Sequence, residues 1–454
     1  MNYKKEDLIL VIVLLGALFV SLSYSFYFRI PPAVDARAYN NIAWNIVTGN
    51  GYREDVNVPI DEDNAIMRVG PGYEFFLAAI YYLFGHHYEA VWVIQALLNV
   101  LSAGLIFLVT KEIFKVHWNY LIGVTAAILI GFSPDLITMQ GMLMTETLGV
   151  FLIVLTAYLF FRYFNQTEKS GWKIFSIGVT LALASTVRTP ALFLIFPIIW
   201  VLWKNKNWKH LLFVFLGLVL IFTPWIARNY YVYRTFVPTN LAYGIDLGSG
   251  NHFGASGELE PYPVNDLYLE QYGLVEGSRR LTGEALRFIV FNPLEFLKIT
   301  LYRTSIYFSF ARPTGFWFHL HGWSKAITLV FSAIYSVILF VFGFWGIWSL
   351  FAGSREARQI SYMNGREKTL AKIFLAMLIM MPLAVVGIIV ETRYRMLVYP
   401  FLAVFAGYGL SVFWQKKLEW QPALIITFLL GANTFFDVSR NLGRIFERIQ
   451  DLTK

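Results

Sequence analysis

The stretch IPPAVDARAYNNIAWNIVTGNGY (30–52), followed by NAIMRVGPGYEFF (64–76), separates two long apolar runs. This polar segment, about residues 29–71, carries a carboxylate, Asp35, just after the first apolar run, and a cation, Arg68, before a Pro-Gly turn. Because apolar runs of this length cross a bilayer as helices, both charges are expected at a membrane surface. An acid and a guanidinium in that position suggest chemistry on an anion carried by a lipid.

The composition is that of a membrane protein. Of the 454 residues, 57% are hydrophobic and 15% are charged, whereas a soluble domain contains about 25% charged residues. Many Tyr and Trp residues stand where apolar runs end, as in the aromatic belts of membrane interfaces. Apolar runs recur along the whole chain and predict an all-α polytopic integral membrane protein with about eleven transmembrane helices.

The net charge of +8 is explained by the expected topology. Lys and Arg gather in the loops that are predicted to be cytoplasmic, as the positive-inside rule requires. The predicted partners are therefore membrane lipids, and no nucleic acid is expected. The chain has no cysteine, which excludes disulfides, thiolate metal sites and cysteine nucleophiles.

Lys4 and Lys5 precede the first apolar run and place the N-terminus in the cytoplasm, so the polar segment becomes the first external loop. The chain is then a multi-pass protein of the cytoplasmic membrane. The predicted spans are residues 8–28, 89–110, 118–133, 147–164, 174–187, 191–203, 211–227, 325–350, 370–390, 396–414 and 421–436.

The remaining segments complete the predicted domain organisation. Residues 72–84 and 296–318 are expected to form interfacial helices. Residues 228–295 are the longest polar stretch, rich in Gly, Asn, Tyr and Pro, and are expected to form a large external loop. The transmembrane domain covers residues 1–436, and a basic C-terminal tail covers residues 437–454.

The middle of the predicted spans is almost free of charge, which argues against a proton path or a channel. The charges stand instead at external helix ends: Asp35, Arg68, Asp135, Glu146, Arg188, Arg228, Glu391, Arg393 and Arg395. A charge at that depth is costly unless it is paired or bound to a ligand. Several helices are therefore expected to converge on one external polar site.

These charges also have structural interpretations. Arg393 and Arg395 could reach lipid headgroups from the helix end, Glu146 could be an acid favoured by the helix dipole, and Asp35 could be an N-cap. The acids at 55, 61, 62 and 63 are expected in a solvated loop. The histidine pairs at 86–87 and 319/321 are weak metal signals, and no metal site is predicted.

Six segments resemble one known family in their order along the chain. They are VDARAYNNIAWNIVTGNGY (34–52), RVGPGYEFFLAAIYYLFG (68–85), TETLGVFL (145–152), LASTVRTPALFLIFP (183–197), FTPWIARNYYVYRTFVPTNLAYGIDLGSGN (222–251) and ETRYRMLVYPFLAVFAGYGL (391–410). The chain resembles the GT-C glycosyltransferases, in particular the dolichyl-phosphate-mannose-protein mannosyltransferase and aminoarabinose-transferase-like group of glycosyltransferase family 39. The resemblance runs from about residue 8 to residue 413.

The resemblance implies transfer of a sugar from a polyprenyl-phosphate donor to an acceptor outside the cytoplasm, with inversion at the anomeric carbon. It maps the general base onto Asp35 and a cation that faces the donor phosphate onto Arg68. Protein-directed relatives have a second acid where this chain has Ala36, so the acceptor class (protein, lipid or glycan) stays open. No cofactor is expected, and a divalent metal stays open.

The charged helix ends supply the rest of the expected site. Guanidinium groups can stabilise a phosphate leaving group without a metal. The candidates for the donor phosphate are Arg68, Arg188, Arg393 and Arg395, and those for the acceptor or sugar are Glu146, Tyr39, Asn251 and Glu391.

Two other functions use the same features. A lipid-sugar flippase would expose a cationic pocket alternately to the two sides, and would show inverted repeats or broken helices near the midplane. An O-antigen polymerase or ligase-like enzyme would use a diphosphate donor and an arginine-rich loop late in the chain. The early loop that contains Asp35 argues against the second of these.

Overall fold

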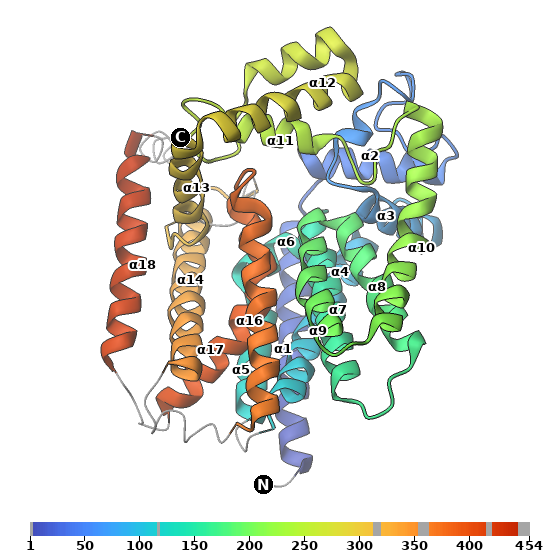
Figure 1. The fold of residues 1–454 in the computed structure, drawn as a ribbon. Helices are drawn as coiled ribbons and strands as arrows, with labels where there is room; N and C mark the ends of the chain where they lie inside the picture. The colour runs from blue at the N-terminus through green and yellow to red at the C-terminus, as the bar shows by residue number, and fades with distance from the viewer. Residues whose placement is uncertain (1–2, 116–118, 312–318, 353–362, 415–419, 444–454) are drawn as a thin grey trace.

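The protein is a bundle of long helices covered at one end by further helices (Figure 1). The computed structural model describes residues 3–115, 119–311, 319–352, 363–414 and 420–443. Every named element in these ranges is a helix. The last residues of the predicted basic tail, 444–454, lie outside the described residues.

Eight helical segments in the described ranges are long and apolar enough to cross a membrane. They are α1 (Tyr3–Phe28), α4 (Tyr88–Ile113), α7 (Thr145–Asn165), α10 (Trp208–Tyr233), α14 (Gly322–Phe351), α16 (Gly365–Val386), η3 with α17 (Thr392–Val398 and Tyr399–Trp414), and α18 (Trp420–Arg440). The prediction of an all-α polytopic membrane protein is confirmed.

Three shorter apolar segments decide the number of spans. Helices α5 (Asn119–Gly131) and α6 (Pro134–Gln140) form one broken segment with a bend of 49°, while α8 (Gly171–Val187) and η2 with α9 (Thr189–Leu194 and Ile195–Lys204) are short. A total of eleven requires all three to count as spans, and the predicted number is therefore not confirmed.

The break between α5 and α6 determines the position of Asp135, which was expected at an external helix end after the predicted span 118–133. Ser133 caps a new helix by accepting a hydrogen bond from the Leu136 N–H at 3.4 Å, and Pro134 stands at its first position. Proline is favoured there because that position needs no N–H donor. Asp135 therefore lies in the first turn of α6 and is completely buried.

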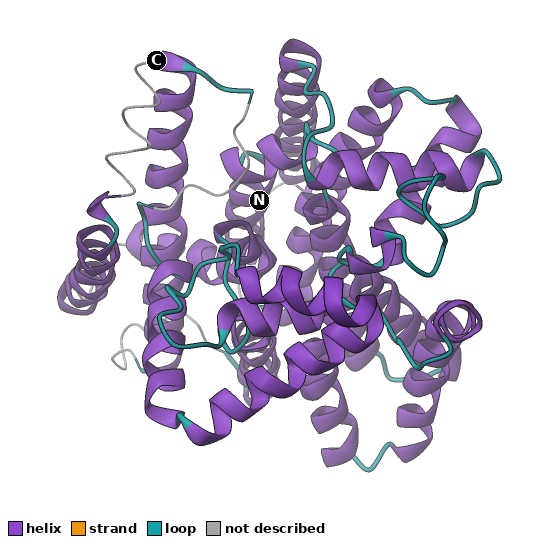
Figure 2. Cartoon of the chain, turned by 90° about the horizontal axis from the view of Figure 1, so that it is seen from above, coloured by secondary structure: helices purple, strands orange, loops and turns teal. Residues whose placement is uncertain are grey.

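Six further helices cover the end of the bundle that carries the candidate site (Figures 1 and 2). They are α2 (Asp35–Val47), η1 (Asn64–Met67), α3 (Pro71–Phe84), α11 (Ala242–Gly250), α12 (Pro263–Phe291) and α13 (Pro293–Tyr307). The predicted large loop 228–295 is thus mostly helical: α10 continues to Tyr233, and α12 is one long element with a kink at Gly273, where φ is +75°. Glycine adopts that left-handed conformation without steric cost.

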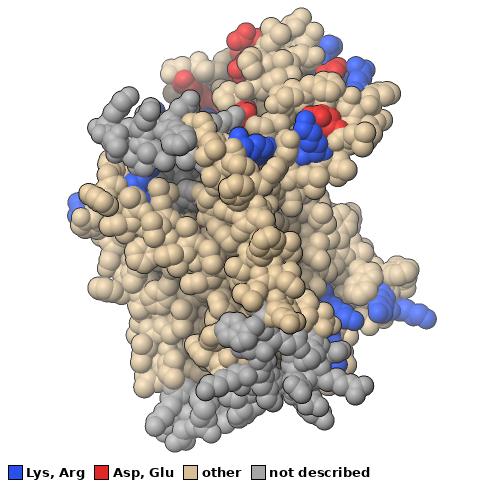
Figure 3. All heavy atoms as spheres, turned by 90° about the vertical axis from the view of Figure 1, so that its left-hand side faces the viewer, with Lys and Arg blue, Asp and Glu red and all other residues tan. Residues whose placement is uncertain are grey.

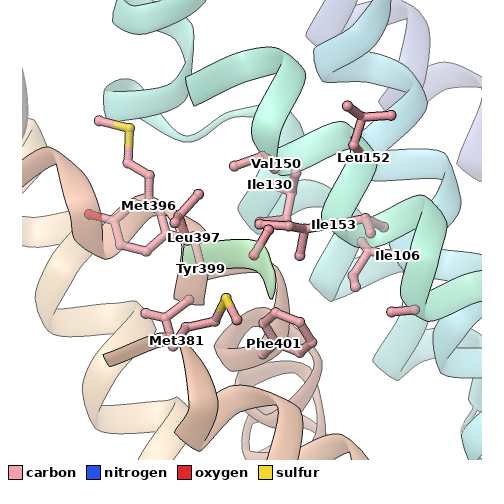
Figure 4. Close-up of a cluster of buried hydrophobic side chains, with 14 of the residues drawn as sticks. Ile106, Ile130, Val150, Leu152, Ile153, Met381, Met396, Leu397, Tyr399 and Phe401 are labelled. Atoms are coloured by element: carbon pink, nitrogen blue, oxygen red, sulfur yellow. The ribbon is translucent and has the colours of Figure 1, made fainter. Parts of the chain in front are cut away.

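Charge is distributed as a membrane protein requires. In Figure 3, the coloured Lys, Arg, Asp and Glu side chains gather toward the two ends of the visible face, and a broad band between them is uncharged. The core lies inside this band. Side chains of α4, α5, α7, α16 and α17 meet there, among them Ile106, Ile130, Ile153, Met381 and Phe401 (Figure 4).

Glycine residues let helices α14 and α17 approach each other closely. A Cβ atom added to Gly346 of α14 would overlap the carbonyl oxygen of Phe405 in α17, and one added to Gly409 would lie 2.6 Å from the carbonyl oxygen of Phe342. Membrane helices associate through such glycines because apolar burial gives little driving force within lipid. This crossing holds α17, and with it η3, against α14.

We expect Gly346→Val to separate α14 from α17 and to lower the free energy of unfolding by about 1–3 kcal/mol, the usual cost of overpacking. Gly431→Val in α18 is the matched control, because no atom lies within 4 Å of a Cβ added there. The thermal unfolding midpoint of each purified variant checks this, and equal midpoints for the two would contradict the close crossing.

Candidate active site

The first external loop brings Asp35 to the start of a helix. Asp35 is the first residue of α2, and Val34 before it has φ +50°, as Arg29 has φ +45°. A β-branched residue such as Val rarely adopts this conformation, and such strain persists only where surrounding structure maintains it. The strained connection turns the chain sharply between α1 and α2, and it places the Asp35 carboxylate at the upper end of the bundle.

Arg393 of η3 joins three carboxylates from distant parts of the sequence. Its Nη2 donates to Asp35 Oδ2 at 2.9 Å, and its Nε donates to Glu391 Oε2 at 2.6 Å. The same Nε lies 3.7 Å from Glu146 Oε1. Glu146 also accepts a hydrogen bond from Arg188, which completes a network of three acids and two arginines. The expected convergence of external helix ends therefore occurs for these five residues.

The two sides of this network differ in their access to solvent. The side chains of Glu146, Arg188 and Arg393 are 0%, 4% and 5% exposed. Those of Asp35 and Glu391 are 23% and 22% exposed. The arginines and Glu146 thus form the floor of the site, while the carboxylates of Asp35 and Glu391 can meet a ligand.

Local sequence explains how Arg188 reaches the floor. Arg188 is the C-cap residue of α8, and Thr189 and Pro190 begin the next helix, η2. Its guanidinium carbon lies 5.2 Å from the centre of the Tyr394 ring, a favourable cation–π contact. Gly149 makes room for its side chain, because a Cβ atom there would lie 3.0 Å from Arg188 Cγ.

Arg68 lies beside the network and is bound to another acid. Its Nη2 donates to Glu54 Oε2 at 2.6 Å, and its side chain is 29% exposed. Asp35 lies close enough to act on Arg68 electrostatically. The glycines of the turn hold this segment against α8: a Cβ atom at Gly72 would lie 2.6 Å from Thr186 Oγ1.

The first loop is more ordered than its composition predicts. Asp63, expected in a solvated segment, is 2% exposed and accepts hydrogen bonds from the backbone N–H groups of Glu54, Asp55 and Ala65 at 2.8–2.9 Å. That expectation was wrong for Asp63 because an aspartate can organise a turn by accepting several N–H donors. It thereby fixes the backbone of Glu54, the partner of Arg68.

Arg228, another charge of the predicted external set, attaches the first loop to α10. Its Nη2 donates to the Tyr52 carbonyl oxygen at 3.0 Å. Its guanidinium carbon lies 5.3–5.4 Å from the ring centres of Tyr52, Trp225 and Tyr233. The guanidinium group of Arg228 therefore has its partners within the protein, and its position favours a structural role.

Arg395 belongs to a second, fully buried network. Its Nε donates to the Tyr399 hydroxyl at 3.1 Å, and that hydroxyl donates to Asp135 Oδ2 at 2.6 Å. Its Nη1 donates to the Ser309 carbonyl oxygen at 2.7 Å. Because Arg395 and Asp135 are both 0% exposed, this position does not favour the predicted contact of Arg395 with a donor phosphate. The network instead anchors η3, which carries Arg393.

Tyr39 and Asn251, the remaining predicted ligand-binding residues, also lie within the protein. Tyr39 is 1% exposed and packs edge-to-face against Tyr73. Asn251 accepts hydrogen bonds from Arg303 Nη1 and Nη2 at 3.3 and 3.2 Å and donates to the Ile388 carbonyl oxygen at 3.3 Å. Asn251 thus joins α11 and α13 to the segment that carries Glu391, and its geometry favours this role over contact with a sugar.

Two carboxyl groups near the site were missed by sequence reasoning. Asp246 of α11 is partly buried and interacts electrostatically with Asp35, Glu391 and Arg393. Burial raises the pKa of Asp246 to about 7. Glu74 of α3 is completely buried, and its burial raises the pKa to about 8. Asp246 does not stand at the end of a predicted span, and Glu74 lies in the first turn of α3, a segment that was expected to be interfacial.

Within the described ranges, no group of three or more His, Asp or Glu side chains is placed to hold a metal ion. Burial raises the pKa of Glu391, and the neighbouring Arg393 opposes that shift.

Comparisons with known proteins place this architecture. Residues 68–227 match the family model described as dolichyl-phosphate-mannose-protein mannosyltransferase. The oligosaccharyltransferase AglB from Archaeoglobus fulgidus, solved with an inhibitory peptide and a dolichol-phosphate, superposes with a TM-score of 0.51 at 14% identity over 96% of this chain. The chain has the GT-C fold.

The GT-C fold is thus confirmed, and at this level of identity the likeness shows the fold alone. The apo form of the Archaeoglobus oligosaccharyltransferase gives a TM-score of 0.50 at 16% identity, with 96% of this chain and 55% of that chain covered. ArnT from Cupriavidus metallidurans, bound to undecaprenyl phosphate, has a TM-score of 0.42 at 14% identity, with 95% and 64% covered. The chain spans 55% of the length of AglB in the peptide complex. A comparison with curated protein sequences gives no match.

The raised pKa of Asp246 predicts a pH-dependent stability difference. Between about pH 4 and pH 7 the folded protein keeps a proton that the unfolded chain has released, so the contribution of Asp246 to stability is full below pH 4 and is lost as the pH rises through 7. Asp246→Asn stays neutral, and we expect it to match the parent protein near pH 4 and to exceed its unfolding midpoint at pH 8.

Thermal unfolding at pH 4, 6 and 8 tests this expectation. Glu270→Gln is the control. This substitution also removes one negative charge, and Glu270 is exposed on α12. A difference between Asp246→Asn and the parent protein that is constant with pH would contradict the assignment.

Proposed function

We propose that this protein is a membrane glycosyltransferase that transfers a sugar from a polyprenyl-phosphate donor to an acceptor on the extracytoplasmic side, with inversion at the anomeric carbon. Asp35 is the general base. The site belongs to the external face of the cytoplasmic membrane, because the basic loops gather at the opposite end of the bundle.

The observation that carries the proposal is the accessible carboxylate of Asp35 above a buried cationic floor. Arg393 fixes one Asp35 oxygen at 2.9 Å, while the side chain stays 23% exposed. A general base needs this combination of fixed position and access, since it must lie within hydrogen-bond reach of the proton that it removes. A solvated surface aspartate would lack the first property, and a fully buried one would lack the second.

The comparisons support the donor class. The family match over residues 68–227 contains Arg68, Glu146 and Arg188. AglB, which shares the fold, was solved with a dolichol-phosphate and a peptide. A polyprenyl phosphate fits a protein whose site lies at the ends of membrane helices, because the isoprenoid can stay in lipid while the phosphate reaches the arginines.

The reaction is a single displacement. An acceptor hydroxyl or amine attacks the anomeric carbon from the face opposite the phosphate, and a new bond forms between the acceptor atom and that carbon. The bond between the anomeric carbon and the phosphate oxygen breaks, and its electron pair stays on the phosphate. Asp35 takes the proton that the acceptor loses. This order inverts the configuration.

Cations stabilise the leaving group. Arg68 is partly exposed and interacts electrostatically with Asp35. We assign it to the departing phosphate, where a guanidinium can donate two parallel hydrogen bonds. Binding of the phosphate would replace the present pair with Glu54. Arg188 and Arg393 add positive potential from the floor. We assign Glu391 and Asp246 to hydrogen bonds from sugar or acceptor hydroxyls, since Glu391 is 22% exposed and Asp246 is partly buried.

We expect Asp35→Asn to keep the fold and to lower sugar transfer by about a hundredfold or more, because the amide cannot accept the acceptor proton. Radiolabelled transfer from a synthetic polyprenyl-monophosphate sugar by purified protein measures it. Asp61→Asn in the same loop is the control, since Asp61 is exposed. Full transfer by Asp35→Asn would remove the base assignment, and transfer only from a diphosphate lipid would favour the O-antigen polymerase class.

Arg68→Gln should weaken donor binding more than acceptor binding. The expected result is a rise of about tenfold in KM for the donor, with little change in KM for the acceptor, because one charge-assisted phosphate contact is lost. Arg234→Gln is the control, an exposed arginine at the same end of the bundle. An equal effect on both substrates would show that Arg68 acts on the fold of the loop.

A further inference from the structure

A polar cavity lies at the end of the bundle opposite the candidate active site. It has a volume of about 430 Å³ and is lined by Glu112, Lys115, Arg162, Asn165, Gln166, Asn364, Arg366, Glu367 and Leu370. Helix α7 carries Glu146 of the active site in its first turn, and it carries Arg162 and Asn165 of this cavity in its last turn. At a rise of about 1.5 Å per residue, the sixteen positions from Glu146 to Arg162 separate the two sites by roughly 24 Å.

The two acids of the cavity are engaged in holding its walls together. Glu367 Oε1 accepts the Lys115 backbone N–H at 2.8 Å, and Glu367 Oε2 accepts the Asn364 N–H at 3.0 Å in a capping box at the start of α16. Glu112 Oε2 accepts a hydrogen bond from Asn165 Nδ2 at 2.7 Å. Both carboxylates therefore join α4, α7 and α16.

Three cations surround these acids at the mouth of the cavity. The Lys115 side chain is 57% exposed, and Arg162 and Arg366 are exposed as well. A contact orients each arginine: Arg162 Nη1 donates to the Tyr158 hydroxyl at 2.8 Å, and Arg366 Nη2 donates to the Phe164 carbonyl oxygen at 3.1 Å. A guanidinium has five N–H donors, so an arginine anchored at one edge can still bind an anion with another.

The position of the cavity indicates that its anion is a lipid headgroup. It lies where α4, α7 and α16 leave the apolar band, which is the level of lipid headgroups. This end of the bundle also carries Lys111, Lys169 and Lys173, which attract anionic lipids to the surface. Basic pockets between membrane helices on the cytoplasmic side bind such headgroups.

The lining suits a phosphodiester in particular. Arginine side chains can donate pairs of hydrogen bonds to phosphate oxygens. The side-chain amides of Gln166 and Asn165 add polar groups for glycerol or ester oxygens. We propose that the cavity formed by Lys115, Arg162 and Arg366 binds the phosphate-bearing headgroup of an anionic phospholipid from the cytoplasmic leaflet. This site is independent of the proposed sugar transfer.

Lipid binding by the purified full-length protein tests the proposal. Native mass spectrometry counts the lipids bound on titration with phosphatidylglycerol, with phosphatidylcholine as the zwitterionic probe and inorganic phosphate as the soluble one. We expect phosphatidylglycerol to bind at least about tenfold more tightly than phosphatidylcholine, and the pair Arg162→Gln/Arg366→Gln to lose at least about tenfold of that affinity.

The matched control is Lys204→Gln/Lys209→Gln, which removes two exposed cations at the same end of the bundle but outside the cavity. This pair should change the affinity by less than about twofold. Equal losses in both pairs would overturn the site in favour of general surface attraction. Equal binding of the two lipids, or occupation by inorganic phosphate in preference to lipid, would overturn the ligand class. If the arginine pair fails to fold, Lys115→Gln should give a smaller loss in the same direction, and an unchanged affinity would count against the proposal.

Discussion

The candidate active site depends on one guanidinium, that of Arg393. It holds Asp35 from the first loop, Glu391 from its own segment and, at a longer distance, Glu146 from the start of α7. Three like charges gathered at a helix-end surface would repel each other without such a partner. Arg393 therefore both assembles the site and orients the carboxylate to which we assign proton transfer.

The rest of the upper end serves to hold Arg393 and Asp35 in place. Arg395, two residues later, is tied through Tyr399 to Asp135, and this buried network fixes η3 against α6 and α14. On the other side, the unusual backbone at Val34 starts α2 where Asp35 can reach Arg393. Two neighbouring arginines thus have different tasks because one turn of η3 points them into different surroundings.

Much of this site could be predicted from where charges stand along an apolar sequence. Asp35, Glu146, Arg188, Glu391 and Arg393 were identified because a charge at the end of a membrane helix needs a partner or a ligand, and the structure brings those five together. Residues of the short helices α3 and α11 gave no such signal, because these helices were not predicted as spans. Asp246 and Glu74 were missed for that reason, and the acid at 63 was misjudged because burial by a turn leaves no pattern in a polar loop.

The sequence by itself determined the all-helical membrane class and the set of charges that must be paired, because the bilayer penalises every unsatisfied polar group. Only the tertiary structure decided which charge pairs with which. Arg393 and Arg395 stand two residues apart in the same sequence motif. Helix packing brings Arg393 into contact with Asp35 and Arg395 into contact with Tyr399. The tertiary structure also turned most of the predicted loop 228–295 into helices that cover the site, since segments far apart in sequence supply their packing partners.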